Sequence, residues 1–236
     1  MIIHNENLNM EQISDSGQCF RMNKIEENKY GLIAFGKYLE LEQLDDHTVS
    51  FHCSEEEFYE IWEDYFDLKY DYKGIVNQLL TGKDEFLQKA AEYGRGIRIL
   101  KQEPFEALIS FIISQNKNIP AIKNCIEAIC KQYGERKVSQ GNQQVEYYTF
   151  PSPEILAQAD KEDLRKLKTG YRDEYIISAA KAVYHEELDL EELKKCTHEV
   201  VVEALKGIHG VGNKVANCVS LYGLHHIEAF PIDIWI

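Results

Sequence analysis

The sequence has no apolar run long enough to cross a membrane, no Cys-x-x-Cys pair, and no nucleotide-binding or metal-catalysis motif. Its first residues lack the basic and apolar blocks of a secretory signal. The six cysteines are dispersed, which argues against a zinc site or an iron–sulfur cluster and suits a reducing cytoplasm. These absences favour a cytoplasmic globular protein that needs no cofactor, no metal ion and no membrane partner.

Positive charge is also scarce, with 26 lysines and arginines against 40 aspartates and glutamates and a net charge of −14. DNA-binding domains are usually basic, so the composition argues against tight non-specific binding to nucleic acid. Docking depends, however, on the local field of one face rather than on the total charge. The basic residues that could supply such a face gather in one stretch: Lys161, Arg165, Lys166, Lys168, Arg172 and Lys181.

The two parts of the chain, residues 1–93 and 94–236, differ in their hydrophobic pattern. The first part alternates polar and apolar residues at Tyr30–Leu41 and Thr48–Cys53, which predicts strands, before helical spacing begins at Glu55. The second part is helical almost throughout, apart from a polar, glycine-containing loop expected at 138–145. The pattern predicts an α+β fold, with an N-terminal antiparallel β-sheet domain followed by an all-α domain.

Capping residues mark several of the expected helix boundaries. Ser54 and Asp160 are predicted N-caps, and Pro120 suits the first turn of a helix. Gly170 is a predicted C-cap, because glycine adopts the left-handed conformation that ends many helices. The helices expected from spacing lie at residues 55–66, 71–80, 84–93, 106–113 and 176–183.

Two helical patterns near the end of the chain are joined by Gly210-Val211-Gly212. A Gly-x-Gly turn between two helices exposes the free backbone N–H groups at the start of the second helix, and such a helix start is a natural phosphate site. A lone glycine pair is weak evidence, since most such pairs simply form turns. In this sequence the pair is followed by Lys214 and, nineteen positions later, by Asp233 behind a proline.

Lys214 and Asp233 can meet in space. A helix beginning near Asn213 leads away by roughly 15 Å, and the segment after it can return by up to about 30 Å if it is extended. The positive end of the helix dipole and partial burial both favour a neutral lysine amine, which can attack an electrophilic carbon. A nearby aspartate can stabilise a cation or transfer protons. The alternative is a surface lysine and a helix-capping aspartate.

These residues resemble the helix-hairpin-helix DNA glycosylases with a Gly/Pro-rich loop and trailing aspartate, and within them the 8-oxoguanine DNA glycosylases. The resemblance implies a bifunctional glycosylase and AP lyase that acts on damaged double-stranded DNA in base excision repair. It assigns Lys214 the attack on C1′ of the damaged nucleotide and the Schiff base that follows. It assigns Asp233 the stabilisation of the cationic transition state. It also implies a sheet domain like that of the TATA-box-binding protein.

Base recognition is implied at two further positions. Ser16-Gly17-Gln18-Cys19 matches a segment in which the glycine carbonyl accepts a hydrogen bond from the N7–H that 8-oxoguanine has and guanine lacks. A fixed acceptor would face a lone pair on the wrong base, which costs binding energy. Cys218 matches the residue on one side of the base. The alternative interpretation of Gly17 is a tight turn.

The resemblance also implies DNA contacts from two loops. Asn116 matches an asparagine that fills the space left by the flipped nucleotide, and Asn118 lies in the same polar loop. Tyr171 matches a residue wedged into the base stack, and Arg172 one directed at the orphaned cytosine. The alternatives are residues that cap helix ends and a solvated arginine. The hairpin residues Gly210, Val211 and Gly212 are expected to bind the DNA backbone.

Two positions depart from the pattern of the eukaryotic members. Ala121 stands where an arginine also reads the cytosine opposite the lesion, so we expect a weaker preference for cytosine. The chain stops three residues after Asp233, and Trp235 replaces a histidine, so the resemblance leaves the base pocket incomplete. We therefore expect a C-terminally truncated chain with reduced or no excision activity. Equal excision by a longer chain would contradict this expectation.

Two alternative functions stay open on the sequence. One is a non-enzymatic DNA-binding module that uses the hairpin only to hold phosphates, which the net acidity leaves room for. The other is an alkylation-damage glycosylase, although those enzymes typically lack the lysine at position 214. In each case we expect a DNA-associated monomer. A structural cation against the hairpin carbonyls is neither predicted nor excluded.

Overall fold

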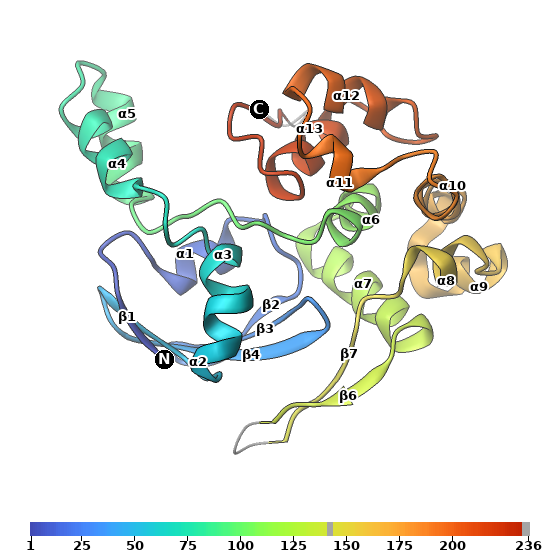
Figure 1. The fold of residues 1–236 in the computed structure, drawn as a ribbon, viewed down its shortest axis with the longest axis horizontal. Coiled ribbons are helices and arrows are strands. Elements are labelled where there is room, and N and C mark those ends of the chain that lie inside the picture. The colour runs from blue at the N-terminus through green and yellow to red at the C-terminus, as the bar shows by residue number, and fades with distance from the viewer. Residues whose placement is uncertain (141–143, 233–236) are drawn as a thin grey trace. The chain divides into compact units, whose positions relative to one another are not determined.

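The computed structural model describes residues 1–140 and 144–232 and contains two compact units (Figure 1). The first unit holds Met1–Ile33 and Tyr38–Leu100, and the second holds Ala34–Lys37, Lys101–Ser139 and the chain from Gln144 onward. The first unit thus extends seven residues beyond the expected boundary at 93. The added segment is bonded to it, because Asn7 Nδ2 donates to the Arg95 carbonyl at 3.0 Å.

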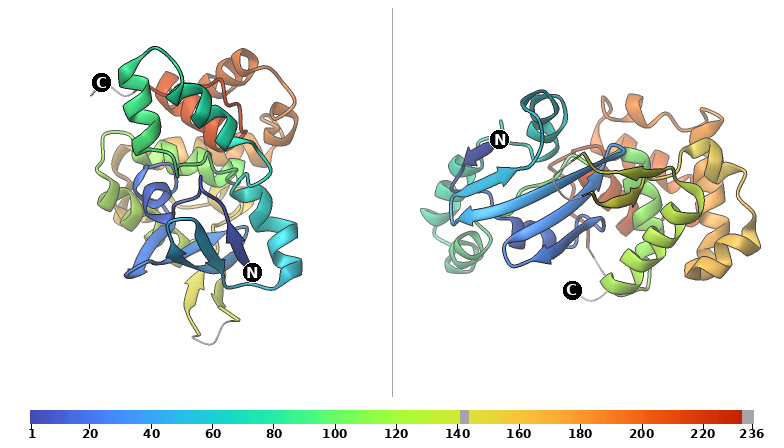
Figure 2. Two further views of the ribbon diagram at one scale, coloured as in Figure 1. Left: turned by 90° about the vertical axis from the view of Figure 1, so that its left-hand side faces the viewer. Right: turned by 90° about the horizontal axis from the view of Figure 1, so that it is seen from below.

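The first unit is built on an antiparallel sheet with strand order β1-β5-β4-β3-β2 among the described residues (Figure 2). Its strands are β1 (Ile2–His4), β2 (Met22–Glu26), β3 (Lys29–Ala34), β4 (Lys37–Asp45) and β5 (Thr48–Phe51). The predicted α+β class is confirmed, with the sheet at the N-terminal end and helices after it. The alternation of apolar residues in β4 and β5 directs Leu39, Leu41 and Phe51 into the core.

Helices complete the first unit. They are α1 (Met10–Asp15), α2 (Glu55–Glu57), α3 (Glu63–Tyr65), α4 (Tyr72–Leu80) and α5 (Glu85–Tyr93), with a wider helical turn at Phe58–Trp62 between α2 and α3. Ser54 is the predicted N-cap, and its side chain accepts the Glu57 N–H at 3.1 Å. Phe51 meets the edges of Phe58 and Phe66 at centroid distances of 5.2 and 5.3 Å, which fixes the helix against the sheet.

The second unit is mainly helical. Its elements are α6 (Pro104–Ser114), α7 (Ile119–Tyr133), β6 (Arg136–Val138), β7 (Glu146–Tyr148), α8 (Pro153–Ala157), α9 (Lys161–Leu164), α10 (Asp173–Tyr184), α11 (Leu190–Leu193), α12 (His198–Lys206) and α13 (Asn213–Tyr222). Helix α6 is the centre of this unit: it is buried from Ala107 to Ser114 and packs against α7, α10 and α13. Within the described part of the loop expected at 138–145, Val138 alone belongs to a strand, because it ends β6 and pairs with Glu146 at the start of β7.

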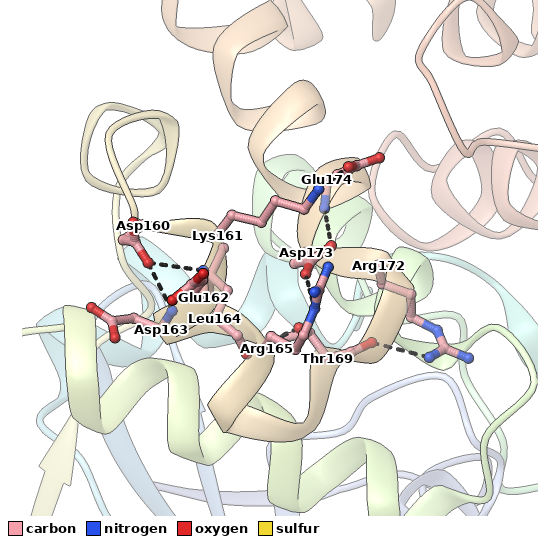
Figure 3. Close-up of polar contacts among 10 residues, drawn as sticks. All are labelled: Asp160, Lys161, Glu162, Asp163, Leu164, Arg165, Thr169, Arg172, Asp173 and Glu174. Atoms are coloured by element: carbon pink, nitrogen blue, oxygen red, sulfur yellow. Dashed lines mark hydrogen bonds and ion pairs between the residues drawn. The ribbon is translucent and has the colours of Figure 1, made fainter.

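The corner after α9 differs from the expectation in one respect (Figure 3). Asp160 caps α9 as predicted, accepting the N–H groups of Glu162 and Asp163 at 2.8 and 3.0 Å. Gly170 is the C-cap of the helical turns that follow α9, as predicted, but the backbone already leaves helical geometry at Lys168, which is left-handed with φ of +66°. Gly170 follows with φ of +62° and ψ of −138°, a conformation that is essentially restricted to glycine.

No helix within residues 1–140 and 144–232 is both long and apolar enough to span a membrane.

Candidate functional site

The turn between α12 and α13, which we call the lysine hairpin (Gly207–Lys214), requires glycine at one position and leaves the other open. Gly210 has φ of +87°, and a Cβ atom there would lie 2.2 Å from the ring of Tyr175. A Cβ atom at Gly212 would have no heavy atom within 4 Å, and as the residue before α13 this glycine offers no side-chain cap. The first N–H groups of α13 therefore face open space beside a glycine, which is the arrangement that suits an anion.

Lys214 lies in the first turn of α13 and is half-buried. Its Nζ is 3.5 Å from Oγ of Ser114, the last residue of α6. The Ser114 hydroxyl is buried and donates to the Phe111 carbonyl at 2.8 Å, so its oxygen is directed and can accept from the amine. The amine is thus held at the junction of two helix ends rather than extended into solvent.

Cys218 is buried one helical turn after Lys214, on the same face of α13. One turn further, Tyr222 stacks on Phe111 of α6 with ring centroids 5.5 Å apart. Burial raises the pKa of Tyr222 to about 12. The face of α13 that carries Lys214 is therefore apolar further along the helix, where Cys218 and Tyr222 lie. Asp233, the other predicted catalytic residue, lies outside the described residues.

The loop between α6 and α7, which we call the Asn116 loop (Gln115–Asn118), joins the lysine hairpin. The Gln115 amide group donates to the Gly210 carbonyl at 3.1 Å. Asn116 is exposed and left-handed, with φ of +49°. Asn118 caps α7, because its Oδ1 accepts the Ala121 N–H at 2.9 Å. That is the capping alternative for Asn118, and a DNA contact from this residue stays a prediction.

Tyr171 and Arg172 lie in the segment before α10, which we call the Tyr171 corner (Lys168–Arg172). Tyr171 is 53% exposed, and its ring lies 4.3 Å from the Arg172 guanidinium. Arg172 is only 4% exposed and donates from Nη1 to the Thr169 carbonyl at 3.1 Å (Figure 3) and from Nη2 to the Gln115 carbonyl. The alternative of a solvated arginine is therefore wrong. The guanidinium is occupied by backbone carbonyls of two loops.

Ser114 and Gln115, which the fold brings against Lys214 and Gly210, were not among the residues predicted from the sequence. In the polar stretch after the buried helix, only Asn116 and Asn118 were predicted to contact DNA. The available signal was position, because the polar residues that directly follow a fully apolar helix must satisfy its last carbonyl groups.

Gly17 belongs to the first unit and is left-handed, with φ of +76°. The side chain of Gln18 is buried beside it, donating to the Arg98 carbonyl and accepting the Leu100 N–H, both at 2.8 Å. These bonds fix the backbone of the turn in which the Gly17 carbonyl lies. The tight-turn interpretation is thus realised, and it is compatible with a rigid acceptor.

Three of the six cations in the predicted basic stretch pair with neighbouring acids, and Figure 3 draws Lys161 and Arg165 among them. Arg165 pairs with Asp173 at 2.8 Å, Lys166 with Asp163 at 2.6 Å, and Lys161 with Glu174. The pairs of Lys161 and Lys166 are exposed and contribute little to stability, whereas Arg165 pairs with the buried carboxylate of Asp173. Each pair offsets positive charge that a basic face would otherwise present. Within the described residues, no group of three or more histidine, cysteine or acidic side chains is arranged to hold a metal ion.

The fold and the hairpin define a helix-hairpin-helix protein with a lysine at the start of the second hairpin helix. Two family models match the chain: the N-terminal domain of 8-oxoguanine DNA glycosylase over residues 1–108, and the HhH-GPD superfamily of base excision DNA repair proteins over residues 109–236. The chain therefore belongs to the HhH-GPD superfamily of base excision DNA repair proteins, and the resemblance inferred from its motifs is confirmed.

Curated relatives of the chain are named N-glycosylase/DNA lyase. The chain is 35% identical over 183 residues to an N-glycosylase/DNA lyase of Saccharomyces cerevisiae, an alignment that covers 73% of this chain and 48% of the yeast protein. It is 33% identical over 159 residues to an N-glycosylase/DNA lyase of Arabidopsis thaliana, covering 65% of this chain and 43% of the plant protein. The chain spans about half the length of these curated relatives.

A solved structure matches over the whole chain. It is the Clostridium acetobutylicum 8-oxoguanine glycosylase/lyase in complex with double-stranded DNA that has cytosine opposite to 8-oxoG. The two are 37% identical with a TM-score of 0.91, and the match covers 100% of this chain and 82% of the other.

Proposed function

We propose that this protein is a base-excision DNA glycosylase that removes 8-oxoguanine from duplex DNA and then cleaves the abasic strand as an AP lyase. The observation that carries the proposal is the position of Lys214, half-buried in the first turn of α13 with its amine 3.5 Å from Ser114 Oγ. A lysine needed only for phosphate binding has no reason to be directed toward a buried hydroxyl. The protein acts as a DNA-associated monomer in this proposal.

The chemistry assigned to Lys214 proceeds in two stages. The neutral amine forms a bond to C1′ of the damaged nucleotide as the bond from C1′ to the base breaks, and the base leaves with that electron pair and takes up a proton. Loss of the amine proton and opening of the sugar ring then give a Schiff base to the lysine. Removal of a proton from C2′ expels the 3′ phosphate and cleaves the strand. Asp233 is proposed to stabilise the positive charge on the sugar and to transfer the protons.

The binding roles follow the family pattern residue by residue. The Gly17 carbonyl is proposed to accept the N7–H of 8-oxoguanine, with Cys218 lying against the base. Asn116 is proposed to fill the gap left by the flipped nucleotide, and Tyr171 to wedge the neighbouring stack. Gly210, Val211 and Gly212 are proposed to lie against the DNA backbone. The Val211 N–H donates to the Ile208 carbonyl at 3.1 Å, so the N–H of Gly212 and those of the first turn of α13 are proposed to bind one backbone phosphate.

The proposal is tested by trapping with borohydride on a duplex that carries one 8-oxoguanine. Borohydride reduces a Schiff base, so the wild-type protein is expected to become covalently linked to this duplex but not to an undamaged one. Lys214→Gln is expected to lose the covalent product while it keeps its affinity for the duplex within about threefold, since a neutral side chain removes one phosphate-attracting charge at most. Lys206→Gln, on the exposed end of α12, is the matched control and should trap normally.

The outcomes separate the proposed function from its rivals. Wild-type protein that binds the lesion duplex without forming a borohydride-stable product contradicts the glycosylase/lyase assignment and favours a binding module. Release of 3-methyladenine but not 8-oxoguanine would favour an alkylation-damage enzyme. Trapping that persists in Lys214→Gln would assign the Schiff base to another amine.

A further inference from the structure

One side chain links the lysine hairpin to the helix that ends beside it. Gln115 Nε2 donates one hydrogen to the Ile112 carbonyl at 3.2 Å and one to the Gly210 carbonyl at 3.1 Å. The two hydrogens of its amide group are thus divided between the last turn of α6 and the hairpin. Gly210 precedes Lys214 by only four residues, so the acceptor of the second bond belongs to the turn that orients the lysine.

The backbone of the same residue is held from the opposite side. The Gln115 carbonyl accepts from Nη2 of Arg172, and Nη1 of that guanidinium donates to the Thr169 carbonyl at 3.1 Å. A second tie runs parallel to the first, because Lys117 Nζ donates to the Lys168 carbonyl. The Asn116 loop and the Tyr171 corner are therefore joined by two cations that each bond a backbone carbonyl across the gap.

Each of the loops tied in this way contains a residue in the left-handed region. The φ angles are +49° at Asn116, +66° at Lys168 and +87° at Gly210. Left-handed conformations are unfavourable for residues other than glycine and persist only when the surrounding structure over-determines them. Three side chains bond backbone carbonyls of a neighbouring loop: Gln115 bonds Gly210, Arg172 bonds Gln115, and Lys117 bonds Lys168. These bonds hold the left-handed residues in place.

We propose that Gln115 is a positioning residue for the reaction, which couples the Asn116 loop and the Tyr171 corner to the lysine hairpin so that the three loops meet DNA as one rigid unit. It does not touch the substrate. It sets the place of the Lys214 amine by holding the Gly210 carbonyl, while Arg172 holds Gln115 in turn. This inference rests on the proposed function for its effect on catalysis, but the coupling of the loops is a property of the DNA-free protein.

The expected effect is on the rate of chemistry rather than on binding. A misplacement of about 1 Å at a reacting group can cost on the order of 100-fold in rate. Gln115→Met keeps the length of the side chain and removes both donors. It is expected to slow single-turnover excision of 8-oxoguanine by about 10- to 100-fold, with the affinity for undamaged duplex unchanged within about threefold. Gln158→Met, at the exposed end of α8, is the matched control and should excise at the wild-type rate.

Gln115→Glu gives a signature that a space-filling role would not produce. An ionised carboxylate has no hydrogen to donate and would face two carbonyl oxygens, whereas the protonated acid restores one donor. Its excision rate, relative to wild type at the same pH, is therefore expected to recover as the pH falls from 8 toward 5. A ratio that stays flat across this range would overturn the hydrogen-bonding role of Gln115.

Hydrogen exchange on the DNA-free protein tests the coupling without any activity. Gln115→Met is expected to speed amide exchange by tenfold or more in peptides covering 207–214 and 168–172, and to leave peptides from α4 and α5 unchanged. If the wild-type protein does not trap on lesion DNA, the proposed function fails while this measurement still decides the coupling. Unchanged exchange in both peptides overturns the coupling. Faster exchange with a wild-type excision rate overturns the positioning role.

Discussion

The amine of Lys214 lies 3.5 Å from the hydroxyl oxygen of Ser114, a residue one hundred positions earlier in the chain. The contact joins the start of α13 to the end of α6. Because these two helices pack together, Ser114 is buried and Lys214 is half-buried. The hydroxyl hydrogen is donated to the Phe111 carbonyl, so the lone pairs of Ser114 are directed toward the amine. Orientation of the amine is therefore a property of helix packing, and it can be tested by mutation.

Ser114→Ala is expected to slow single-turnover excision of 8-oxoguanine without abolishing it. A single neutral hydrogen bond contributes about 0.5–1.5 kcal/mol, which corresponds to a two- to twelvefold loss of rate. Borohydride trapping should persist, because the nucleophile itself is retained. Ser178→Ala in α10 serves as the control. A loss as large as that of Lys214→Gln would instead give Ser114 a direct part in the chemistry.

The glycines of the lysine hairpin are expected to respond differently to alanine. Gly210→Ala places a methyl group 2.2 Å from the Tyr175 ring in a left-handed residue, and should lower the free energy of unfolding by about 2–4 kcal/mol. Gly212→Ala meets no neighbour within 4 Å and has φ of −98°, so its stability should stay within about 0.5 kcal/mol of wild type.

The effect on DNA affinity should follow the opposite order. Among folded molecules, Gly212→Ala is expected to weaken duplex binding more than Gly210→Ala does. The methyl group of Gly212→Ala occupies the space in front of the N–H groups of α13, so folded Gly212→Ala is expected to bind duplex more weakly than wild type. Urea unfolding and duplex titration measure the two quantities. Normal DNA binding by Gly212→Ala would argue that phosphate does not approach the hairpin there.

Ala121 sets an expectation for the base opposite the lesion. It lies in the first turn of α7, with its N–H bonded to Asn118, and its methyl side chain cannot read a base edge. When excision of 8-oxoguanine is measured opposite each of the four bases, the wild-type protein is expected to show a weaker preference for cytosine than the eukaryotic members with arginine at this position. Ala121→Arg should raise that preference by about 1–3 kcal/mol, which is roughly 5- to 150-fold. A strong cytosine preference in the wild-type protein would refute the prediction.

Tyr72 of the first unit predicts a specific loss of stability in alkali. Burial raises the pKa of Tyr72 to about 12 from the ordinary value of 10.0, and its hydroxyl donates to Asp67 while accepting the Ile99 N–H. The folded protein therefore keeps a proton that the unfolded chain releases near pH 10. The stability that Tyr72 contributes is present below pH 10 and is lost as the pH rises toward 12.

The measurement compares the free energy of unfolding of wild type and Tyr72→Phe. The difference between them should be largest at pH 9 and should narrow between pH 10 and 12, since phenylalanine has no proton to lose. Tyr59→Phe, at a side chain that is 54% exposed, is the control and should show no such narrowing. A difference that stays constant with pH would contradict the burial of the Tyr72 hydroxyl.

Much of the fold could be predicted because its signals are local. The N-caps Ser54 and Asp160 bond N–H groups two or three residues away, and the helical spacing of apolar residues extends over a few turns. The C-cap at Gly170 was predicted from the same local signals, whereas the left-handed turn at Lys168, whose carbonyl is bonded by Lys117, was not. Glycine therefore ends the helical turns as its local preference predicts, while the conformation of Lys168 accompanies a contact between two loops that local preference does not report.

The amino-acid sequence established which residues have the chemistry: a lysine after a Gly-x-Gly turn, and polar side chains in the loops around it. Their partners could not be read from the sequence. Gln115 bonds Gly210 across 95 positions, Arg172 bonds Gln115 across 57, and Lys214 meets Ser114 across 100. Propensity and periodicity report on neighbours within one or two helical turns, whereas these contacts exist because α6, α10 and α13 pack around one core. The burial of Arg172 and the orientation of Lys214 follow from that packing.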